Sequence, residues 1–315
     1  MGFFDKIREP VFLKEDSAAQ QQLAALEALH TEAAGELAQQ LEEEICRVKA
    51  GILGEQTVHF ELANSHIPMY VLHDLYLEHD GLSAQIDYLL VTRKRIFVLE
   101  CKNLYGDITI TSSGDFIRTM QYGKRTKKEG IYSPITQNRR HLDLIKAIRA
   151  ETRTSRLFQS IFEKSFYENY RSLVVLSNPK TVLNDRYAKK EIKAQVLRAD
   201  QLAERIRSIN AEVDTAVQSE KDMEALAQFF LALHKPQSTD YTQKYREALA
   251  EQKQAAEAAQ APVPAPASAA EETPVLCPVC GAPMVRRKAT RGKNAGQEFY
   301  GCSRYPKCRG IVSIP

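Results

Sequence analysis

Residues 85–102 read QIDYLLVTRKRIFVLECK, two apolar runs joined by a short charged segment. The composition of each run favours a β-strand, and Arg93-Lys94 supplies a turn, so the stretch predicts an antiparallel hairpin. Side chains alternate between the two faces of a strand, so Glu100 and Lys102 project from the same face. Asp87, on the preceding strand, is then expected to reach the same point.

Two carboxylates and an amine at one point suit the hydrolysis of a phosphodiester near neutral pH. That reaction uses a divalent cation to shield the phosphate and to lower the pKa of a water molecule, and Mg²⁺ or Mn²⁺ prefers oxygen ligands. Asp87 and Glu100 would supply those oxygens, while Lys102 would orient the water or stabilise the charge that develops on the phosphate. The alternative is a chance arrangement in a charged hairpin, and spacing alone favours that alternative.

The chain as a whole has the size and composition of a soluble protein of mixed class. Its 315 residues, 43% of them apolar, are enough for two or three folded units. No long apolar segment follows Met1–Lys6 and no apolar run of membrane length occurs, so we expect a cytoplasmic protein. Four of the six cysteines lie in the last segment, which argues against a disulfide scaffold.

Basic residues are concentrated at the C-terminal end. Residues 277–315 carry eight Lys or Arg and one acid, Glu298, although the net charge of the whole chain is only +3. The remainder of the chain is therefore acidic. A compact basic segment of this kind is typical of a protein that binds a polyanion.

The N-terminal part has helical periodicity. Over residues 17–64 leucine and isoleucine recur at spacings of three and four, and Gly51 and Gly54 are candidate breaks. A coiled-coil dimer arm is the alternative to a helix packed on its own domain. His30 and Gln40 interrupt the heptads, which favours packing within the chain.

Short β-rich runs follow the helical part and predict a meander of antiparallel strands. The predicted strands cover residues 69–77, 84–92, 95–101 and 107–111, with turns that include His79-Asp80-Gly81. Further along, the pattern predicts a helix over 136–151, a strand over 173–176, a strand and helix within 196–210, and a helix over 220–235.

The composition changes again after Pro236. Residues 240–260 predict an exposed helix rich in Ala, Gln, Glu and Lys. Residues 261–274 (APVPAPASAAEETP) predict a Pro/Ala linker too poor in apolar residues to fold. The last forty or so residues would then form a tethered module.

The segments around the charged hairpin resemble the nuclease-related domain of the PD-(D/E)xK superfamily over about residues 48–165. The resemblance is carried by Gly54-Glu55, Gln85-Ile86-Asp87, 97–103 (FVLECKN), Gly106-Asp107-Ile108 and 134–137 (PITQ). It implies an active centre made of Glu55, Asp87, Glu100, Lys102 and Gln137. That family often has Asn-Pro shortly before the Gln, whereas this chain has Ser133-Pro134. Serine can make the same local turn contact.

Other polar groups near this centre have two interpretations. No pair among His59, His66, His73 and His79 has ligand spacing together with a third partner, so surface or core histidines are favoured over metal ligands. The run 124–128 (KRTKK) is either a solvated loop or a rim that holds substrate phosphates. Tyr122 and Tyr132 flank this run and offer stacking surfaces.

The cysteine-rich segment predicts a structural zinc site. CPVCG at 277–281 is a metal-binding knuckle, and Cys302 and Cys308 complete a set of four thiolates with no open position. The five residues between Cys302 and Cys308 make a longer spacing than the generic ribbon has, and Pro306 is expected to set that turn. A redox dithiol is the alternative, but no thioredoxin-like βαβ pattern surrounds the knuckle.

This segment is similar to the zinc ribbon at the end of bacterial type IA topoisomerases, over roughly residues 275–314. The similarity lies in CPVCGAPMV, FYGCS and YPKCRG. It implies binding of single-stranded DNA, with phosphate contacts from basic side chains and base stacking from aromatic ones. The candidate residues are Arg286, Arg287, Lys288, Arg291, Lys293, Tyr300, Arg304, Tyr305, Lys307 and Arg309.

We therefore predict an α/β restriction-endonuclease-like core, a mixed sheet flanked by helices, with an N-terminal helical extension and a small C-terminal zinc ribbon. The expected parts are a helical extension (1–47), the nuclease-related domain (48–165), an α/β completion of the core (166–235), a helix with linker (236–274) and the ribbon (275–315). The expected activity is metal-dependent cleavage of DNA. The alternatives are a non-catalytic DNA-binding protein of DNA repair or topology control, and an RNA nuclease.

Overall fold

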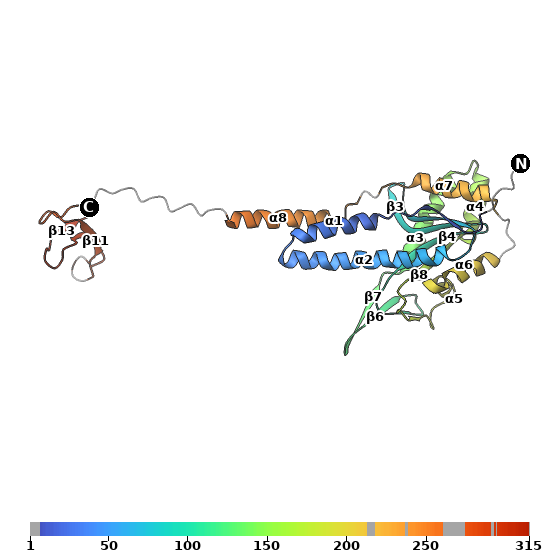
Figure 1. The fold of residues 1–315 in the computed structure, drawn as a ribbon, viewed down its shortest axis with the longest axis horizontal. Helices are drawn as coiled ribbons and strands as arrows, with labels where there is room; N and C mark the ends of the chain where they lie inside the picture. Colours follow the sequence, from blue (N-terminus) through green and yellow to red (C-terminus); the bar gives the residue numbers. More distant parts are fainter. Residues whose placement is uncertain are drawn as a thin grey trace. The chain divides into compact units, whose positions relative to one another are not determined.

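The structure, a computed structural model, describes residues 7–212, 218–236, 239–260, 275–290, 293 and 295–314 (Figure 1). The chain divides into two compact units, Met1–Lys253 and Gln254–Pro315, and each is described by itself. Met1–Lys6, the predicted linker 261–274 and Arg291 lie outside the described residues. No helix in the described part of the chain has the length and apolar character needed to cross a bilayer.

The first unit is built on a mixed β-sheet with the strand order β1-β2-β3-β4-β8-β10. The predicted antiparallel meander forms its middle, because β2 pairs with β3 and β3 pairs with β4 in antiparallel fashion. Strands β1, β8 and β10 extend the sheet on either side through parallel pairing. The strands are β1 (Pro10–Lys14), β2 (Met69–His79), β3 (Leu82–Thr92), β4 (Ile96–Lys102), β8 (Tyr170–Leu176) and β10 (Val196–Arg198).

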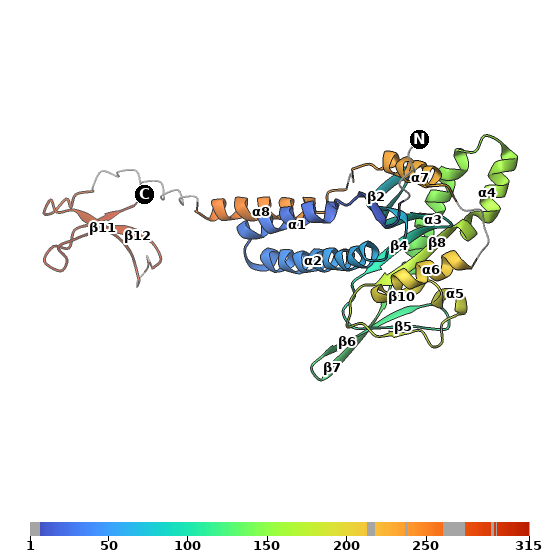
Figure 2. The same ribbon diagram turned by 45° about the vertical axis from the view of Figure 1, so that its right-hand side comes forward.

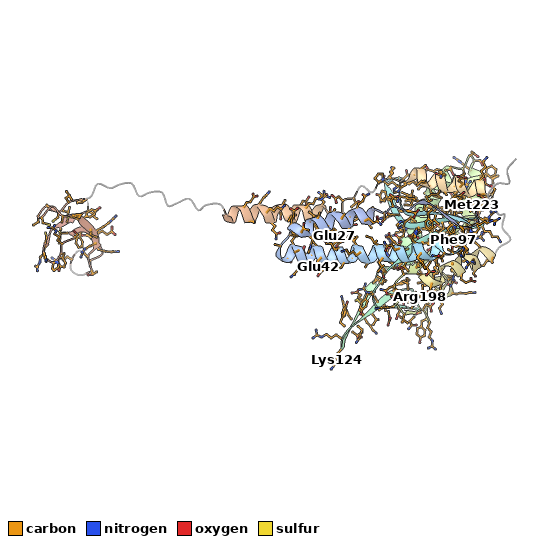
Figure 3. The ribbon with its side chains drawn as sticks, in the orientation of Figure 1. Glu27, Glu42, Phe97, Lys124, Arg198 and Met223 are labelled. Carbon is orange, nitrogen blue, oxygen red and sulfur yellow. The ribbon has the colours of Figure 1, made fainter. Side chains whose placement is uncertain are left out.

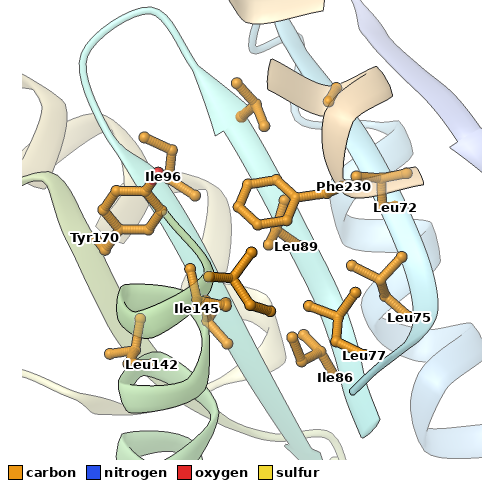
Figure 4. Packing of buried hydrophobic residues seen from close by; sticks show 14 of the residues in the cluster. Leu72, Leu75, Leu77, Ile86, Leu89, Ile96, Leu142, Ile145, Tyr170 and Phe230 are labelled. Atoms are coloured by element: carbon orange, nitrogen blue, oxygen red, sulfur yellow. The ribbon is translucent and has the colours of Figure 1, made fainter. Parts of the chain in front are cut away.

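Helices cover both faces of this sheet, as predicted. On one face, α3 (Pro134–Glu151), α4 (Arg156–Asn169) and α7 (Glu220–Leu233) pack on β2, β3 and β4. Figure 4 shows this packing, with side chains of α3 and α7 lying on the strand residue Leu89. On the other face, α2 (Gly35–Ala63) and α6 (Leu202–Ala211) bury a second apolar cluster. The sheet is thus apolar on both sides, and polar side chains in its strands stand out as candidates for function.

The hairpin β2–β3 is closed by the predicted turn and interrupted in its middle. Asp80 and Gly81 both have positive φ angles, 47° and 74°, which is the conformation of a two-residue type I′ turn. Halfway along β2, consecutive apolar residues on the face toward α3 and α7 are three positions apart, Leu72 and Leu75, instead of two. At the same level of β3, Ile86 and Leu89 are also three positions apart. Asp74 lies at this irregularity of β2 and has a φ of 50°. Strict alternation therefore fails in both strands at the same level.

A second, smaller sheet has the order β7-β6-β5-β9; β5, β6 and β7 lie between β4 and α3 in the chain, and β9 follows β8. Its strands are β5 (Asp107–Ile110), β6 (Phe116–Tyr122), β7 (Arg125–Ile131) and β9 (Leu183–Asn184). The expectation that 107–111 continues the meander is wrong, because β5 pairs with β6 and β9 rather than with β4. The basic run 124–128 is likewise not a loop, since most of it belongs to the hairpin β6–β7.

The predicted N-terminal helix is a helical hairpin. Helix α1 (Ala18–Glu32) is separated from α2 by Ala33 and Ala34, so the break does not fall at Gly51 or Gly54, which both lie inside α2. The apolar stripe of both helices is buried within the chain, which confirms packing on its own domain. Helix α8 (Gln243–Gln260) joins this cluster through Tyr245 and Leu249, so its first half is not exposed as expected.

Short elements complete the first unit, and a small sheet forms the second. The first unit also contains α5 (Lys190–Lys193) and the 3₁₀ turn η1 (Ala199–Gln201). The second contains antiparallel strands in the order β11-β12-β13. These are β11 (Met284–Lys288), β12 (Glu298–Cys302) and β13 (Ile311–Ser313).

Candidate active site and zinc site

A cavity of about 290 Å³ opens where α2, β3, the end of β4 and the start of α3 meet. All five residues predicted for the active centre line it, although they come from four elements and are spread over more than 80 positions of the chain. The lining residues are Gly51, Gly54, Glu55, Gln85, Asp87, Glu100, Cys101, Lys102, Asn103 and Gln137.

Glu100 and Lys102 form an ion pair at the end of β4, on the face of the sheet that α3 covers. The Nζ of Lys102 lies 2.6 Å from Oε1 of Glu100 and donates to Oε1 of Gln137 at 3.2 Å. Burial alone would lower the pKa of Lys102, but the charges of Glu100 and Asp87 outweigh it and raise that pKa. Lys102 is thus held as a cation beside two carboxyl groups.

Gln137 is placed by the way in which α3 begins. Ser133 precedes the helix and its Oγ accepts from the backbone N–H of Thr136 at 3.3 Å, while Pro134 occupies the first turn. This is the arrangement of a capped helix start. Ser133 therefore makes the local contact that the sequence predicts for it, and Gln137 follows one turn later.

Asp87 reaches the end of β4 through a backbone contact. The β3–β4 ladder runs from Val91↔Ile96 to Tyr88↔Leu99, so the next N–H that β4 directs toward β3 is open to a side chain. Oδ2 of Asp87 accepts the backbone N–H of Cys101 at 2.6 Å. Burial and the nearby Glu100 raise the pKa of Asp87 well above its usual value, since two carboxylates compete for one site.

Glu100 is the most deeply buried of these acids, with 1% of its side chain exposed. Its Oε1 faces Lys102, whereas its Oε2 is buried and has no hydrogen-bond partner among the described residues. Burial raises the pKa of Glu100, and Lys102 only partly offsets that effect. A buried carboxylate oxygen without a partner is costly, so a ligand at this point would satisfy it.

Glu55 is held by a histidine that the sequence interpretation left outside the site. Nε2 of His73 lies 2.9 Å from Oε2 of Glu55, and its Nδ1 lies 2.9 Å from the backbone oxygen of Glu15. Both partners can only accept, so the ring donates from both nitrogens. Burial lowers the pKa of His73, but the bonds to Glu55 and Glu15 outweigh burial and raise it.

His141, another residue that sequence reasoning missed, faces Glu100. Its Nδ1 lies 3.7 Å from Oε2 of Glu100, and neither atom has a hydrogen-bond partner among the described residues. Burial, together with the charge of Lys102, lowers the pKa of His141 to about 4, so the ring is neutral near pH 7. The signal in the sequence is its position four residues after Gln137, on the same face of α3.

Helix α2 approaches the end of β4 closely enough to need a glycine. A Cβ on Gly54 would lie 2.6 Å from Oγ of Ser177 and 2.7 Å from Cβ of Asn103. Asn103 also donates from Nδ2 to the backbone oxygen of Ala50 at 2.7 Å. This contact fixes the turn of α2 that carries Glu55 against the strand that carries Lys102.

The donor set at this cavity fits Mg²⁺ or Mn²⁺ in its chemistry. Three of the lining side chains are carboxylates, and one oxygen of Glu100 lacks a hydrogen-bond partner among the described residues. Within the described residues, three protein ligand atoms lie within 4.8 Å of one another only at the four cysteines and at the exposed group His79, Asp80 and Glu151. Mg²⁺ does not need three, because it commonly binds one or two carboxylates and keeps water or phosphate oxygens for the rest.

The four cysteines of the second unit come together as predicted. Their Sγ atoms all lie within 4.8 Å of one another, with 3.7 Å between Cys277 and Cys308 and 3.5 Å between Cys280 and Cys302. Zinc–sulfur bonds of about 2.3 Å in a tetrahedron place sulfurs about 3.8 Å apart. The cluster therefore fits a structural zinc ion. Gly310 is required beside it, because a Cβ there would lie 2.3 Å from Sγ of Cys277.

The basic and aromatic side chains predicted to contact DNA lie mainly on the surface of the ribbon. The exposed ones are Arg286, Arg287, Lys288, Lys293, Arg304, Tyr305, Lys307 and Arg309. Tyr300 is half-buried on β12, and Arg286 pairs with Glu298. Arg287 lies over the ring of Tyr305, at 6.0 Å from its centroid, so these two side chains form one surface.

Comparison with known families gives a match for the segment with the acidic cavity and another for the segment with the four cysteines. A family model described as a nuclease-related domain matches residues 50–177, and one described as a topoisomerase DNA-binding C4 zinc finger matches residues 274–315. No curated protein and no solved structure gives a significant match to the chain. The chain thus carries a nuclease-related domain, a mixed α/β fold, and a zinc ribbon of DNA-binding type.

Proposed function

We propose that this protein hydrolyses phosphodiester bonds of DNA with a divalent cation, and that its zinc ribbon binds single-stranded DNA. The observation that carries the proposal is the convergence of Glu55, Asp87, Glu100, Lys102 and Gln137 on one cavity inside the nuclease-related domain. Charged groups this deeply buried are costly to stability, and such clusters concentrate at catalytic sites.

Each residue has a role that follows from its contacts. Asp87 and Glu100 would hold Mg²⁺ or Mn²⁺, which when bound would shield the phosphate and lower the pKa of the attacking water. Lys102, held as a cation by Glu100, would stabilise negative charge that develops on the phosphate. Gln137 fixes the Nζ of Lys102, and Glu55, held by His73, would orient water at the mouth of the cavity.

The ribbon would raise the local concentration of DNA and would take no part in the hydrolysis itself. A zinc ion held by Cys277, Cys280, Cys302 and Cys308 would have no open position for a substrate. Its basic surface would bind the phosphates of a single strand, and Tyr305 would stack on bases. Because one chain carries both parts, DNA held by the ribbon would be present at high effective concentration for the cavity.

Cleavage assays with matched variants test the activity. Zinc-loaded protein is incubated with single- and double-stranded DNA, with Mg²⁺ or Mn²⁺ and without added divalent cation. Asp87→Asn and Lys102→Ala should each lower the cleavage rate by at least about 100-fold, since each removes one electrostatic contribution to the transition state. Asp80→Asn, in the exposed turn between β2 and β3, is the matched control and should cleave normally.

Two outcomes would favour the alternatives. If the protein binds DNA and leaves it uncut with either cation, it is a non-catalytic DNA-binding protein of repair or topology control. If it binds and cuts matched RNA strands as well as DNA, the preference for DNA is wrong and the RNA nuclease becomes the better description.

A further inference from the structure

The hairpin β6–β7 projects from the wall of the candidate active site. The chain leaves the cavity at Lys102, forms β5, β6 and β7, and returns at α3, which carries Gln137. Figures 1 and 2 both show β6 and β7 extending away from the central sheet. The hairpin is therefore an insertion whose two ends join lining residues of the same cavity.

The hairpin is strongly basic and its outer part is exposed. Residues 116–131 contain five Lys or Arg and a single acid, Glu129. Residues 121–128 are all exposed, and Figure 3 shows Lys124 at the tip. Strand pairing places Arg125 opposite Tyr122 and Lys127 opposite Met120, so these side chains share one face.

An aromatic pair connects that face with the active-site strand. The rings of Tyr105 and Tyr122 lie 6.3 Å apart and are 53% and 56% exposed. Tyr105 follows Lys102 by three residues, and its hydroxyl donates to the backbone oxygen of Gln121 at 3.4 Å. The loop that follows the active-site strand is thereby bonded to the hairpin.

The base of the hairpin is closely packed. Phe116 is buried with Ile108 and Ile110 in an apolar cluster that also includes residues of β8 and β10 in the central sheet. Gly106 has a φ of 100°, and a Cβ there would lie 2.4 Å from the backbone oxygen of Thr119 in β6. Only glycine fits this position, so the start of β5 and β6 pack closely together at the base of the hairpin.

We propose that this hairpin enters the major groove of duplex DNA and sets the duplex against the cavity. The inference rests on the proposed function and deepens it, because it assigns a duplex segment to the substrate. A two-stranded β-ribbon fits the major groove of B-DNA, which is about 12 Å wide. Its exposed part includes four residues of β7, which at about 3.3 Å each span roughly 13 Å, about the width of the groove.

Solubility is the competing explanation of these charges. Lysines on an edge strand such as β7 also prevent pairing with another molecule. Solubility would require neither the face shared by Tyr122 and Arg125 nor the contact with Tyr105. The deep and narrow major groove of A-form RNA excludes the hairpin, so groove entry and general attraction to polyanions predict different results with RNA duplexes.

The test uses the full chain with Lys124→Ala, Arg125→Ala and Lys127→Ala combined. The matched control removes three exposed charges from α4 and α7, Arg156→Ala, Lys164→Ala and Lys221→Ala. Both views show α4 and α7 on the side of the unit away from β6 and β7. Binding of a labelled DNA duplex, the corresponding single strand and an RNA duplex is measured by fluorescence anisotropy at several salt concentrations, without divalent cation.

The hairpin variant should bind duplex DNA at least about 10-fold more weakly, and its salt dependence should fall by about 2.7 in log–log slope, or 0.9 for each lost phosphate contact. Single-strand binding, which the ribbon supplies, and the control variant should change less than about twofold. The proposal is overturned if wild-type protein does not bind duplex DNA, if the hairpin variant binds it normally, or if all three nucleic acids are weakened equally. Since binding is measured without catalysis, a protein that binds through the hairpin but never cleaves contradicts only the proposed function.

Discussion

His141 lies one helical turn after Gln137 on α3, and the two side chains face the two charged residues of one strand: Gln137 contacts Lys102, and His141 faces Glu100. A single helix face thus borders both members of the ion pair. The arrangement makes α3 the element that sets the environment of Glu100, and it makes His141 a positioning residue rather than a catalytic one.

Replacing His141 by Phe should weaken cation binding more than it weakens the fold. The ring volume is kept, but the polar atom beside Oε2 of Glu100 is lost. Changes to groups that orient a metal ligand commonly cost 10- to 100-fold in metal affinity. We expect the Mg²⁺ concentration for half-maximal cleavage to rise about 10-fold for His141→Phe, with an unchanged melting temperature. An unaltered Mg²⁺ dependence would show that His141 only fills space.

Two glycines of α2 should respond to alanine in opposite directions. Gly51→Ala meets nothing within 4 Å and removes the entropic cost of a helical glycine, so it should stabilise the protein by about 0.5–1 kcal/mol. Gly54→Ala collides with Ser177 and Asn103 and should destabilise by about 1–3 kcal/mol. Denaturant unfolding measures both. Equal effects of the two substitutions would rule out the close approach of α2 to β4.

The bond between His73 and Glu55 should make stability depend on pH. The pKa of His73 is higher in the folded protein than in the unfolded chain, so its contribution is complete below about pH 6.5 and is lost as the pH rises through the folded value. His73→Phe keeps a ring beside Tyr88 but removes the bond, and it should cost about 2 kcal/mol at pH 6 and less at pH 9. Unfolding curves at the two pH values check this. A cost that is the same at both would contradict the charged state of His73.

Loss of the zinc site should weaken single-strand binding without unfolding the first unit. Cys302→Ser removes one of four ligands, and small zinc modules lose their fold with the metal. We expect less than one zinc per chain and at least about 10-fold weaker binding of single-stranded DNA, while the main unfolding transition stays in place. Cys46→Ser, an exposed cysteine outside the cluster, is the control. Full zinc content in Cys302→Ser would remove Cys302 from the ligand set.

The central hairpin could be predicted from the sequence because its signals are local. Apolar runs, charged turns and the spacing of Glu100 and Lys102 all act within about twenty residues. The four cysteines could be predicted for the same reason, since ligand spacing reflects one metal. The hairpin and the zinc site are thus predictable because their signals lie within short stretches of sequence and do not depend on distant contacts.

The missed features depend on contacts between distant residues. Gly54 reads as a helix break because glycine disfavours helices, yet its position is set by Asn103 and Ser177. Strand β7 is mostly charged, so only its pairing with β6 makes it a strand. His73 has no ligand spacing in sequence, and its role appears only when β2 lies beside α2.

The coincident interruptions of β2 and β3 at Asp74 and Asp87 have a consequence for how the chain folds. When strands are apolar on both faces, a shifted register still buries apolar side chains, so the apolar pattern alone does not fix the register. Here two irregular points must meet, and any slipped arrangement would leave Asp74 and Asp87 against regular backbone. The two irregular points therefore favour one register of the β2–β3 hairpin, and that register fixes the level of the sheet at which Asp87 lies.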